Sequence, residues 1–340
     1  MQFTRTHIIV FLSIAAVAFL FFTFPAPSVL PKVQTPSSSS ETAPRFSLWP
    51  SPKEQQAIVV PPAASSSPAQ DTSPFVSSQP VPAPVATQDA PAQKSAAVEA
   101  RIAYVADIET GRVAYQKNAS RRWPLASLTK LMGAVIAERG MKMDDVVTIA
   151  SSSFQLSKNY TEVYTLRPGD EYTVADLLKL MLLPSNNEAA DALAAFYGRD
   201  RFIAAMNAQA AAWGMNDTHY EDPTGLSVLD QSTANDMFTL AGHVYREYPQ
   251  ILKITRTPQL DITELSENKS FMIASINEFA GKAGFIGGKT GFTGQAGENL
   301  ASFFTIGGQP VFVLVMGSSD RFGETGKLVN WLQSGSRMGG

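Results

Sequence analysis

Hydrophobic and polar residues divide the 340-residue chain into three parts. The first contains an almost unbroken apolar run from Ile8 to Phe24, which follows Arg5 and ends at Pro25. About 17 residues are just enough to cross a bilayer as a helix. A secretory signal peptide has a shorter core and a cleavage site between small residues. We therefore expect residues 1–24 to form an uncleaved signal anchor rather than a removed signal peptide, with the Arg5 side in the cytoplasm.

The second part, residues 25–97, is rich in Pro, Ser, Ala, Thr and Gln and holds 15 of the 22 prolines. Too few apolar residues cluster here for burial to offset the entropy lost on ordering. We expect a disordered, semi-extended linker of polyproline character that holds a folded domain away from the membrane. A Pro-rich ligand for a partner domain would have the same composition.

The third part, residues 98–340, has the pattern of one globular domain. Alternating residues at 101–116, around Glu109-Thr110-Gly111, predict a β-hairpin. Apolar residues spaced by three and four positions predict helices. The helices are expected at 127–138 (with Gly140 just after its end), 173–183 (broken at Pro184), 188–197, 202–213 and 323–332, and further strands at 285–293, 299–306 and 310–316.

This order of elements predicts the fold class. Strands at both ends with helices between them favour an α/β (α+β) domain. We expect an antiparallel sheet whose first and last segments pair, flanked by helices and with a helical lobe inserted. A transmembrane helix and a disordered linker would precede it.

Composition and charge exclude several kinds of chemistry. The chain has no Cys and only three His, so disulfides, thiol catalysis and a structural zinc cluster are excluded, and we expect no metal and no cofactor. We expect His219 and His243 to pack or to form hydrogen bonds. The formal charge of −3, with 17% charged residues, gives no basic field for a phosphate backbone. Nucleic acid is therefore not an expected partner.

Ser127 and Lys130 are the first candidates for catalysis. Without Cys, the nucleophile must be Ser, Thr, Lys or a carboxylate. A Ser-His-Asp triad is disfavoured, because His is scarce and no Gly-x-Ser-x-Gly elbow precedes a helix. The sequence Ser127-Leu128-Thr129-Lys130 instead places a hydroxyl and an amine on one face of a helix's first turn. Free N–H groups at that helix end can stabilise an oxyanion.

The Ser-x-x-Lys spacing alone is weak evidence for a catalytic site. Ser266-Glu267-Asn268-Lys269 also matches it, in a polar stretch that we expect to be a solvated loop. Ser-x-Asn occurs at Ser157, Ser266 and Ser275 as well as at Ser185. Ser127 by itself could be a helix N-cap, so the order and context of the motifs must decide.

Three motifs occur in order: Ala126-Ser127-Leu128-Thr129-Lys130, then Ser185-Asn186-Asn187, then Lys289-Thr290-Gly291. In this order they resemble the penicillin-recognising serine enzymes, and most closely the serine-type D-alanyl-D-alanine carboxypeptidases. The resemblance covers about residues 98–333 and includes 166–173, 222–226, 232–237 and 296–297. It implies a β-lactamase/transpeptidase-like fold.

The resemblance also implies a role for each motif residue. Ser127 would attack the carbonyl between two D-alanines and form an acyl-enzyme that water resolves. Lys130 would take the proton of the Ser127 hydroxyl. An amine can act as a base at neutral pH only if burial or a second cation lowers its pKa. Lys289 is the implied second cation. Ser185 would pass a proton to the leaving amine. Asn187 would bind the substrate's amide and hold Lys130.

The third motif would bind the substrate. Lys289 and Thr290 would face the cleft from a strand edge, and Gly291 would let the substrate backbone approach closely. Thr290, Thr293 and Arg321 would meet the terminal carboxylate. Arg321 is the least specific of these, because an arginine at a helix start is commonly a surface charge.

The oxyanion hole is implied at the backbone N–H groups of Ser127 and Phe292. The family often reads Ser-Gly-Asn-Asp at the second motif, so Asn186 is expected to add bulk near the cleft. The chain also stops soon after Trp331, without the β-rich second domain and C-terminal anchor of many relatives. The N-terminal segment is therefore expected to do any anchoring.

Together these features predict a single-pass cell-membrane enzyme, with its catalytic domain on the extracytoplasmic (periplasmic or cell-wall) side. It would remove the terminal D-alanine of peptidoglycan stem peptides and be acylated by β-lactams. Three alternatives stay open: a D,D-endopeptidase that cleaves cross-links, a β-lactamase, and a catalytically silent cell-wall binding module. A class A β-lactamase needs a glutamate that holds water, and no candidate lies in a recognisable motif: Glu162, Glu171, Glu188 and Glu221.

Two further segments are expected to have structural roles. Ser232, Thr233 and Asp236 have the pattern of a helix cap. Gly225 and Leu226 are expected in a turn and in the core, respectively.

Overall fold

The computed structural model describes residues 96–151 and 164–335, which belong to one compact unit of the chain. The predicted signal anchor and nearly all of the predicted linker lie outside the described residues. Among the helices in the described ranges, none is both long and apolar enough to cross a bilayer.

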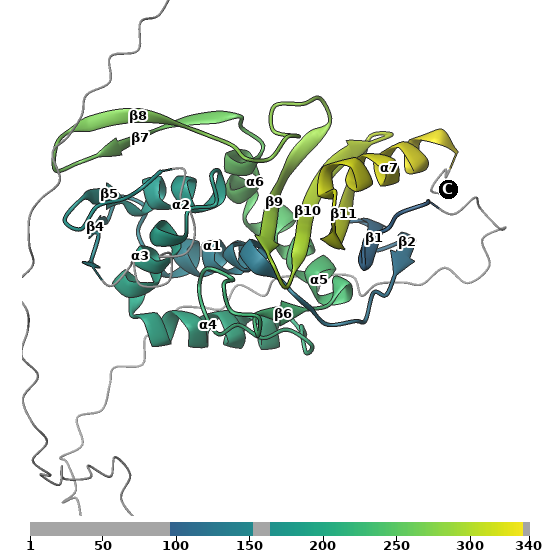
Figure 1. Cartoon of the computed structure of the whole chain (residues 1–340), viewed down its shortest axis with the longest axis horizontal. Helices are drawn as coiled ribbons and strands as arrows, with labels where there is room; N and C mark the ends of the chain where they lie inside the picture. The colour runs from purple at the N-terminus through teal and green to yellow at the C-terminus, as the bar shows by residue number, and fades with distance from the viewer. Residues whose placement is uncertain (1–95, 152–163, 336–340) are drawn as a thin grey trace, which may run out of the picture. The chain divides into compact units, whose positions relative to one another are not determined.

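A five-stranded antiparallel sheet forms the centre of the domain, with strand order β2-β1-β11-β10-β9 (Figure 1). Its strands are β1 (Ile102–Asp107), β2 (Val113–Lys117), β9 (Phe285–Thr293), β10 (Gly297–Ile306) and β11 (Gln309–Ser318). The predicted hairpin is β1 and β2, with Ala103 opposite Lys117. β1 also pairs with β11, where Ile102 lies opposite Met316. The predicted pairing of the first and last segments is thereby confirmed.

Helices occupy the positions that the apolar spacing predicts, and two more, α5 and α6, were not predicted from that spacing. They are α1 (Thr129–Gly140), α2 (Val174–Leu182), α3 (Asn187–Tyr197), α4 (Arg199–Ala212), α5 (Ala234–Glu247), α6 (Pro249–Thr255) and α7 (Arg321–Ser334). The side chains of Thr173, Thr233 and Asp320 cap α2, α5 and α7 by accepting the N–H three residues on. The cap predicted at 232–236 is therefore confirmed. Gly140, in contrast, is the last residue of α1, and Met141 follows as its C-cap.

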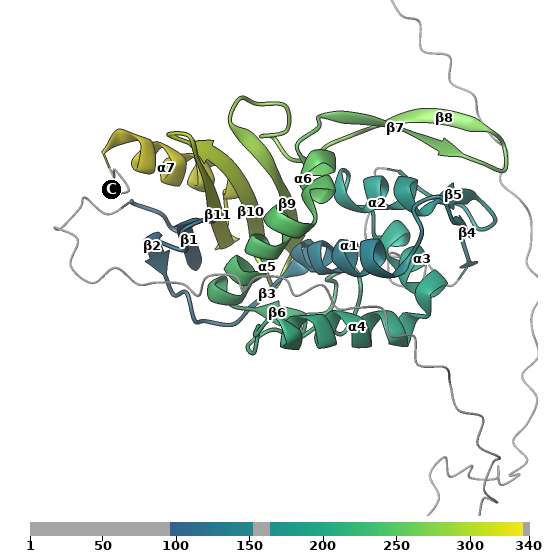
Figure 2. The same cartoon turned by 180° about the vertical axis from the view of Figure 1, so that it is seen from behind.

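Alternate residues of the central strands face two separate hydrophobic clusters, as the pleat requires. Ala103 and Val105 lie in a cluster with Leu328 and Leu332 of α7. Ile102 and Tyr104 lie in the larger cluster, to which α1 to α6 contribute. The reverse view shows α1 to α4 gathered beside the sheet as a lobe (Figure 2). This lobe is the inserted helical part that the sequence predicts.

Three short antiparallel pairs complete the domain. They are β3 (Trp123–Pro124) with β6 (Gln231–Ser232), β4 (Val146–Thr148) with β5 (Glu171–Thr173), and β7 (Gln259–Glu264) with β8 (Lys269–Ala274). The β7–β8 hairpin passes over α2 in both views (Figures 1 and 2). The second Ser-x-x-Lys match begins in its turn, where Ser266 is exposed, and ends at Lys269, the first residue of β8.

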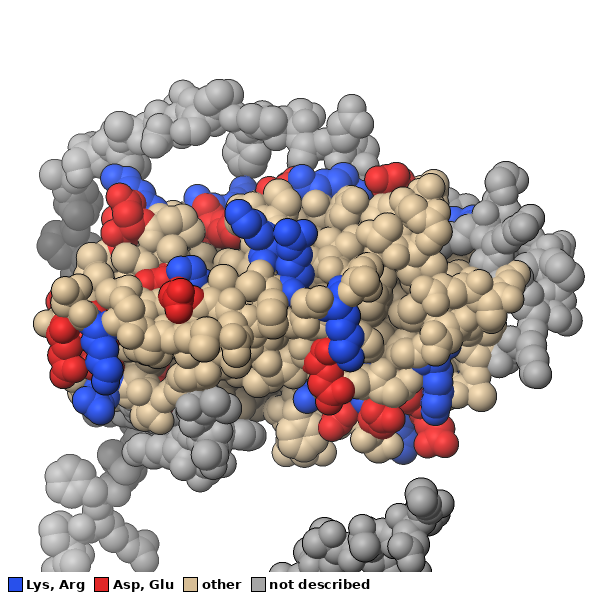
Figure 3. Space-filling view, turned by 90° about the horizontal axis from the view of Figure 1, so that it is seen from above, with Lys and Arg blue, Asp and Glu red and all other residues tan. Residues whose placement is uncertain are grey.

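The upper face of the molecule is largely uncharged (Figure 3). Lys and Arg side chains gather near its middle, and acidic side chains lie mainly toward its edges. Most of this face is therefore neutral, and its charged side chains form small separate groups.

Candidate active site

Ser127 lies in a short 3₁₀ helix, η1 (Ala126–Leu128), which leads directly into α1. Ala126 has a φ of +49°, a left-handed conformation that is unfavourable for a residue with a side chain. Two glycines pack against this turn. A Cβ on Gly225 would lie 1.9 Å from the Ala126 carbonyl oxygen, and one on Gly291 would lie 2.9 Å from the Leu125 carbonyl oxygen. Their close approach fixes the backbone that carries Ser127.

The buried amine of Lys130 faces three oxygen atoms. Its Nζ lies 2.8 Å from Ser127 Oγ, 2.7 Å from Asn187 Oδ1 and 2.9 Å from the Thr224 carbonyl oxygen. Lys130 is 0% exposed, so these groups replace the water that would otherwise solvate the amine. The structure therefore joins the first two motifs at one nitrogen atom.

The side chain of Asn186 does not lie where the sequence analysis placed it. The Asn186 side chain caps α3 by accepting the Ala189 N–H at 2.7 Å, and its amide donates to the Tyr164 carbonyl at 2.6 Å. It is 1% exposed, so the prediction that it adds bulk near the cleft is wrong. Ser185 has a φ of +65°. Beyond this turn of the backbone, the Asn186 side chain is buried and the Asn187 side chain reaches Lys130.

Lys289 joins the third motif to the second. Its Nζ lies 2.7 Å from Ser185 Oγ and 2.9 Å from the Thr290 carbonyl oxygen. Burial, together with the positive charges of Lys130 and Arg321, lowers the pKa of the Lys289 amine well below its ordinary value. The implied pair of neighbouring lysines is therefore present.

Arg321, at the start of α7, lies beside β9. Its guanidinium donates to the Gly291 carbonyl at 3.1 Å, and its backbone N–H donates to Glu298 at 3.0 Å. Burial lowers the pKa of this guanidinium. The structure thus places Arg321 at the third motif rather than as an isolated surface charge.

The remaining residues of the third motif differ in exposure along β9. Thr290 and Thr293 are buried, and the Thr293 hydroxyl accepts the Ala296 N–H at 3.1 Å. The Phe292 side chain is 58% exposed. Gly291 was expected to admit the substrate backbone, but the backbone of η1 occupies the space beside it. Its small size therefore serves the chain's own packing.

The turn at Gly225 was expected from the sequence, but the contact of its Thr224 carbonyl with Lys130 was not. A backbone oxygen has no side-chain signature, so its contact with Lys130 could not be read from residue types. The preceding Asp222 was a usable signal, because Asp followed by Pro, Thr and Gly favours a tight turn. Gly225 lies in that turn with a φ of +85°, as expected, while Leu226 is half-buried rather than part of the core.

The histidines and glutamates singled out in the sequence have structural partners. His243 stacks on Trp213 with ring centroids 4.0 Å apart and bonds to Glu247, and His219 lies 3.9 Å from Glu221. Glu188 accepts the Leu166 N–H, and Glu171 bonds to Thr148. Glu162 lies outside the described residues. Within residues 96–151 and 164–335, no cluster of His, Asp and Glu could hold a metal ion.

Comparison with known proteins identifies the family. The model of peptidase family S11, D-alanyl-D-alanine carboxypeptidase, matches residues 87–320. The chain belongs to this family. The D-alanyl-D-alanine endopeptidases of Pseudomonas aeruginosa and Escherichia coli K12 are 35% and 32% identical to it. These matches cover 68% and 69% of this chain, and 77% and 78% of the relatives.

Other relatives carry a different name. The D-alanyl-D-alanine carboxypeptidase DacF of Bacillus subtilis is 30% identical, over 70% of this chain and 62% of its own length. Among solved structures, the Streptomyces K15 DD-transpeptidase has a TM-score of 0.65 at 26% identity, covering 70% of this chain and 98% of that one. A D-alanyl-D-alanine carboxypeptidase from Mycobacterium tuberculosis has a TM-score of 0.62 at 28% identity, covering 75% and 94%. The transpeptidase-like fold is therefore confirmed.

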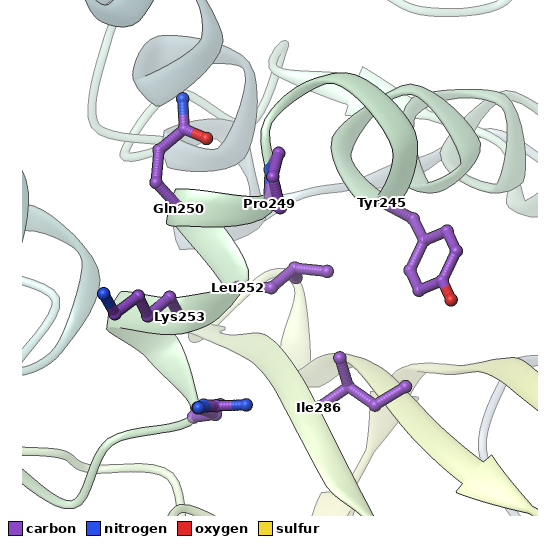
Figure 4. Close-up of a pocket in the computed structure, with 7 residues that line it drawn as sticks. Tyr245, Pro249, Gln250, Leu252, Lys253 and Ile286 are labelled. Carbon is purple, nitrogen blue, oxygen red and sulfur yellow. The ribbon is translucent and has the colours of Figure 1, made fainter.

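A groove of about 440 Å³ lies elsewhere, between α5, α6 and β9 (Figure 4). Its lining includes Tyr245 of α5, Leu252 and Lys253 of α6, and Ile286 of β9. None of the three sequence motifs lines this groove. The cluster around Ser127 is therefore the candidate active site.

Proposed function

We propose that this serine peptidase of family S11 cleaves the D,D-cross-link between peptidoglycan stem peptides. Removal of a terminal D-alanine is the second candidate, and it is the activity that the sequence motifs favoured. Both reactions pass through an acyl-enzyme on Ser127. The two most similar relatives described above are named endopeptidases, and they match over more of their own length than DacF does, which supports the first candidate.

One observation carries the assignment of the reaction. The amine of Lys130 lies 2.8 Å from Ser127 Oγ, and the amine of Lys289 lies 2.7 Å from Ser185 Oγ. Each of these buried amines therefore lies within hydrogen-bond distance of a serine hydroxyl, and a nucleophile beside a base is what nucleophilic acyl transfer requires. A silent binding module would have no need for such pairs.

The proposed reaction has two steps. Ser127 Oγ bonds to the carbonyl carbon as its proton passes to Lys130, and the carbonyl electron pair moves to oxygen near the N–H groups of Ser127 and Phe292. The oxygen's electron pair then re-forms the carbonyl and expels the amine, which takes a proton through Ser185. Water attacks the acyl-enzyme by the same sequence and releases the shortened peptide. Lys289, Thr290, Thr293 and Arg321 would bind the substrate's negative charge.

The first test is the intact mass of the full chain and of Ser127→Ala after incubation with penicillin. A single penicillin adduct in the parent, absent in the variant, is expected. An adduct that persists in Ser127→Ala would remove Ser127 from this role. A folded parent that neither gains mass nor consumes penicillin would favour the silent binding module.

A second test separates the two substrates. A purified cross-linked muropeptide dimer and an uncross-linked pentapeptide monomer are incubated with the chain, and products are separated by chromatography. Faster conversion of the dimer to monomers is expected. Release of free D-alanine from the monomer at a higher rate would instead make the chain a carboxypeptidase.

The apolar run at residues 8–24 and the linker lead us to propose that the chain is anchored in the cell membrane with its catalytic domain outside the cytoplasm. In fractionation, the full chain should remain with membranes after a high-salt wash. A chain that begins at residue 25 should not. Equal membrane retention of both chains would contradict the anchor.

A further inference from the structure

The partners of Lys130 differ in what they can do. A neutral amine that acts as a base has two N–H groups and one lone pair. The carbonyl oxygen of Thr224 and the amide oxygen of Asn187 can only accept hydrogen bonds, whereas the Ser127 hydroxyl can also donate one. If the two acceptors take the two N–H groups, the lone pair is directed at the Ser127 proton.

The Thr224 carbonyl owes its position to the carboxylate of Asp222. Asp222 Oδ1 accepts the Thr224 N–H at 2.6 Å, the Thr224 hydroxyl at 2.6 Å and the Gly225 N–H at 2.7 Å. Its Oδ2 accepts the Ser227 N–H at 2.5 Å. Asp222 is 7% exposed and Thr224 is 0% exposed, so water does not compete strongly for these bonds.

The same turn also contacts the nucleophile's own backbone. Gly225, the residue after Thr224, packs so closely on the Ala126 carbonyl that a Cβ there would overlap it at 1.9 Å. The turn therefore touches the chain just before Ser127 and, through Thr224, the amine of Lys130. Its conformation sets the geometry of both reacting groups.

We propose that Asp222 is a positioning residue for acylation. It holds the 222–227 turn so that the Thr224 carbonyl, together with Asn187, orients the Lys130 amine toward Ser127. After proton transfer the amine carries three N–H groups, and the same three oxygens can accept all of them. This inference rests on the proposed nucleophile and deepens the account of that site.

The test compares Asp222→Ala, Asp222→Asn and Glu221→Gln in the full chain. Asparagine keeps an Oδ1 that can accept from Thr224 and Gly225, although its amide cannot accept from Ser227. Alanine removes all four bonds. Glu221→Gln is the matched control, because it removes a charge one residue away, from a carboxylate that accepts the Ser227 hydroxyl at 3.2 Å and lies 3.9 Å from His219.

Acylation by a fluorescent penicillin is followed over a range of concentrations, which separates the acylation rate constant from the affinity of the initial complex. Misplacing a reacting group by about 1 Å can cost about 100-fold in rate. Asp222→Ala should therefore lower the rate constant by about 100-fold with little change in affinity, and Asp222→Asn by less than about tenfold. Glu221→Gln should match the parent.

A parental rate constant in folded Asp222→Ala would overturn the proposal, even if its thermal stability falls. If that variant does not fold, Thr224→Val takes its place. It removes the hydroxyl's bond to Asp222 and the bond that the hydroxyl accepts from the Leu226 N–H, and it keeps the backbone carbonyl. A parental rate constant in that variant would likewise overturn the proposal. If Asp222→Ala and Asp222→Asn lower the acylation rate constant equally, the negative charge of Asp222 is what matters, and the positioning role is contradicted. A parent that is not acylated at all would defeat the proposed function instead, so the two failures are distinguishable.

Discussion

Two residues at the site adopt backbone conformations that side chains disfavour. Ala126 and Ser185 have φ values of +49° and +65°, and a left-handed residue other than glycine costs about 1 kcal/mol or more. Ala126 precedes Ser127, and Ser185 supplies the hydroxyl that bonds to Lys289. The packing of Gly225 and the capping of α3 by Asn186 hold these conformations in place.

Gly225→Ala tests whether this packing is needed. The new methyl group would overlap the Ala126 carbonyl, and the residue would keep a φ of +85° only under strain. The free energy of unfolding should fall by roughly 3 kcal/mol or more, and penicillin acylation should slow by about 100-fold. Chemical denaturation and acylation kinetics measure the two effects.

Gly214→Ala is the matched control. Gly214 has a φ of +73°, but a Cβ there would meet nothing within 4 Å. The free energy of unfolding of this variant should fall by only about 1 kcal/mol, and its acylation rate should equal that of the parent. If both variants acylate at the same rate, close approach at Gly225 is not what positions Ser127.

Asp230 gives a prediction about pH. It is 0% exposed, and burial together with the negative charge of Asp222 raises its pKa to about 7. Because the folded pKa is the higher one, this group's contribution to stability is fully present below pH 3.8 and is lost as pH rises through about 7. Asp230→Asn removes that titration while keeping an acceptor for the N–H groups of Glu221 and Asp222.

Relative to Asp230→Asn, the parent should therefore lose roughly 2–3 kcal/mol of unfolding free energy between pH 5 and pH 8. Denaturant titration of both chains at each pH gives the difference, and groups that titrate in both chains cancel. A difference that is constant with pH would show that the folded pKa of Asp230 lies outside this window.

At the residue scale, the sequence was most informative where the chemistry needs a particular side chain. Ser127, Lys130, Ser185, Asn187 and Lys289 were selected by motif, and the structure brings them together. Asn186 was misinterpreted, and the packing of Gly291 on η1 was not foreseen, because these partners are other parts of this chain. Such partners depend on tertiary packing, which residue types in a motif do not reveal.

Among the elements, the β7–β8 hairpin was not predicted. The first strand, QLDITE, alternates polar and apolar residues only over its short length, and the second, KSFMIA, has an unbroken apolar run instead of alternation, so the pair left a weak local signal. Two carboxylates tie this hairpin to the helical lobe. Asp176 of α2 accepts the Thr263 N–H, and Glu264 of β7 accepts the Glu171 N–H. Long-range bonds of this kind leave no local pattern in the sequence.

Glu264→Gln tests the attachment of this hairpin. Burial opposes ionisation of Glu264, but N–H donors from Glu171, Ser266 and Glu267 and the Ser266 hydroxyl lower its pKa to about 2. A lowered folded pKa contributes stability above pH 4.5 that is lost as pH falls toward 2. At pH 7 the variant should exchange the amide hydrogens of residues 171, 266 and 267 faster than the parent.

This difference in hydrogen exchange should shrink as pH falls from 5 to 3, after correction for intrinsic rates. Glu267→Gln is the control, because Glu267 is exposed in the same turn. Equal exchange in all three chains at pH 7 would mean that the Glu264 carboxylate does not fasten the hairpin to β5.

At the scale of the whole molecule, the beginning and the end of the domain stabilise each other. Glu324 of α7 accepts the Ala100 N–H at 2.7 Å, just before β1, and the Ser318 hydroxyl at 3.0 Å, at the end of β11. Leu328 and Leu332 cover the sheet face that Ala103 and Val105 present. The catalytic cluster lies on the part of the chain between these two ends.

Leu328→Ala should therefore lower global stability without changing the chemistry. Leu328 is 0% exposed, and truncation of such a side chain costs about 2–5 kcal/mol. The acylation rate at a temperature well below unfolding should equal that of the parent. Lys327→Ala, at the exposed neighbouring position, should alter neither quantity. A slowed acylation in folded Leu328→Ala would show that α7 acts on the site itself.

The pairing of β1 with β11 also bears on when the enzyme becomes active during its synthesis. A sheet that joins residues so far apart in sequence forms slowly and only once its last strand is available. β9, whose Gly291 fixes the backbone at Ser127, is supported on its inner side by β10 and then β11. A nascent or truncated chain that lacks β11 would therefore carry the whole Ser127 motif without the strands that support β9. The geometry at Ser127 should depend on the last strand of the sheet, which the ribosome makes long after the motif itself.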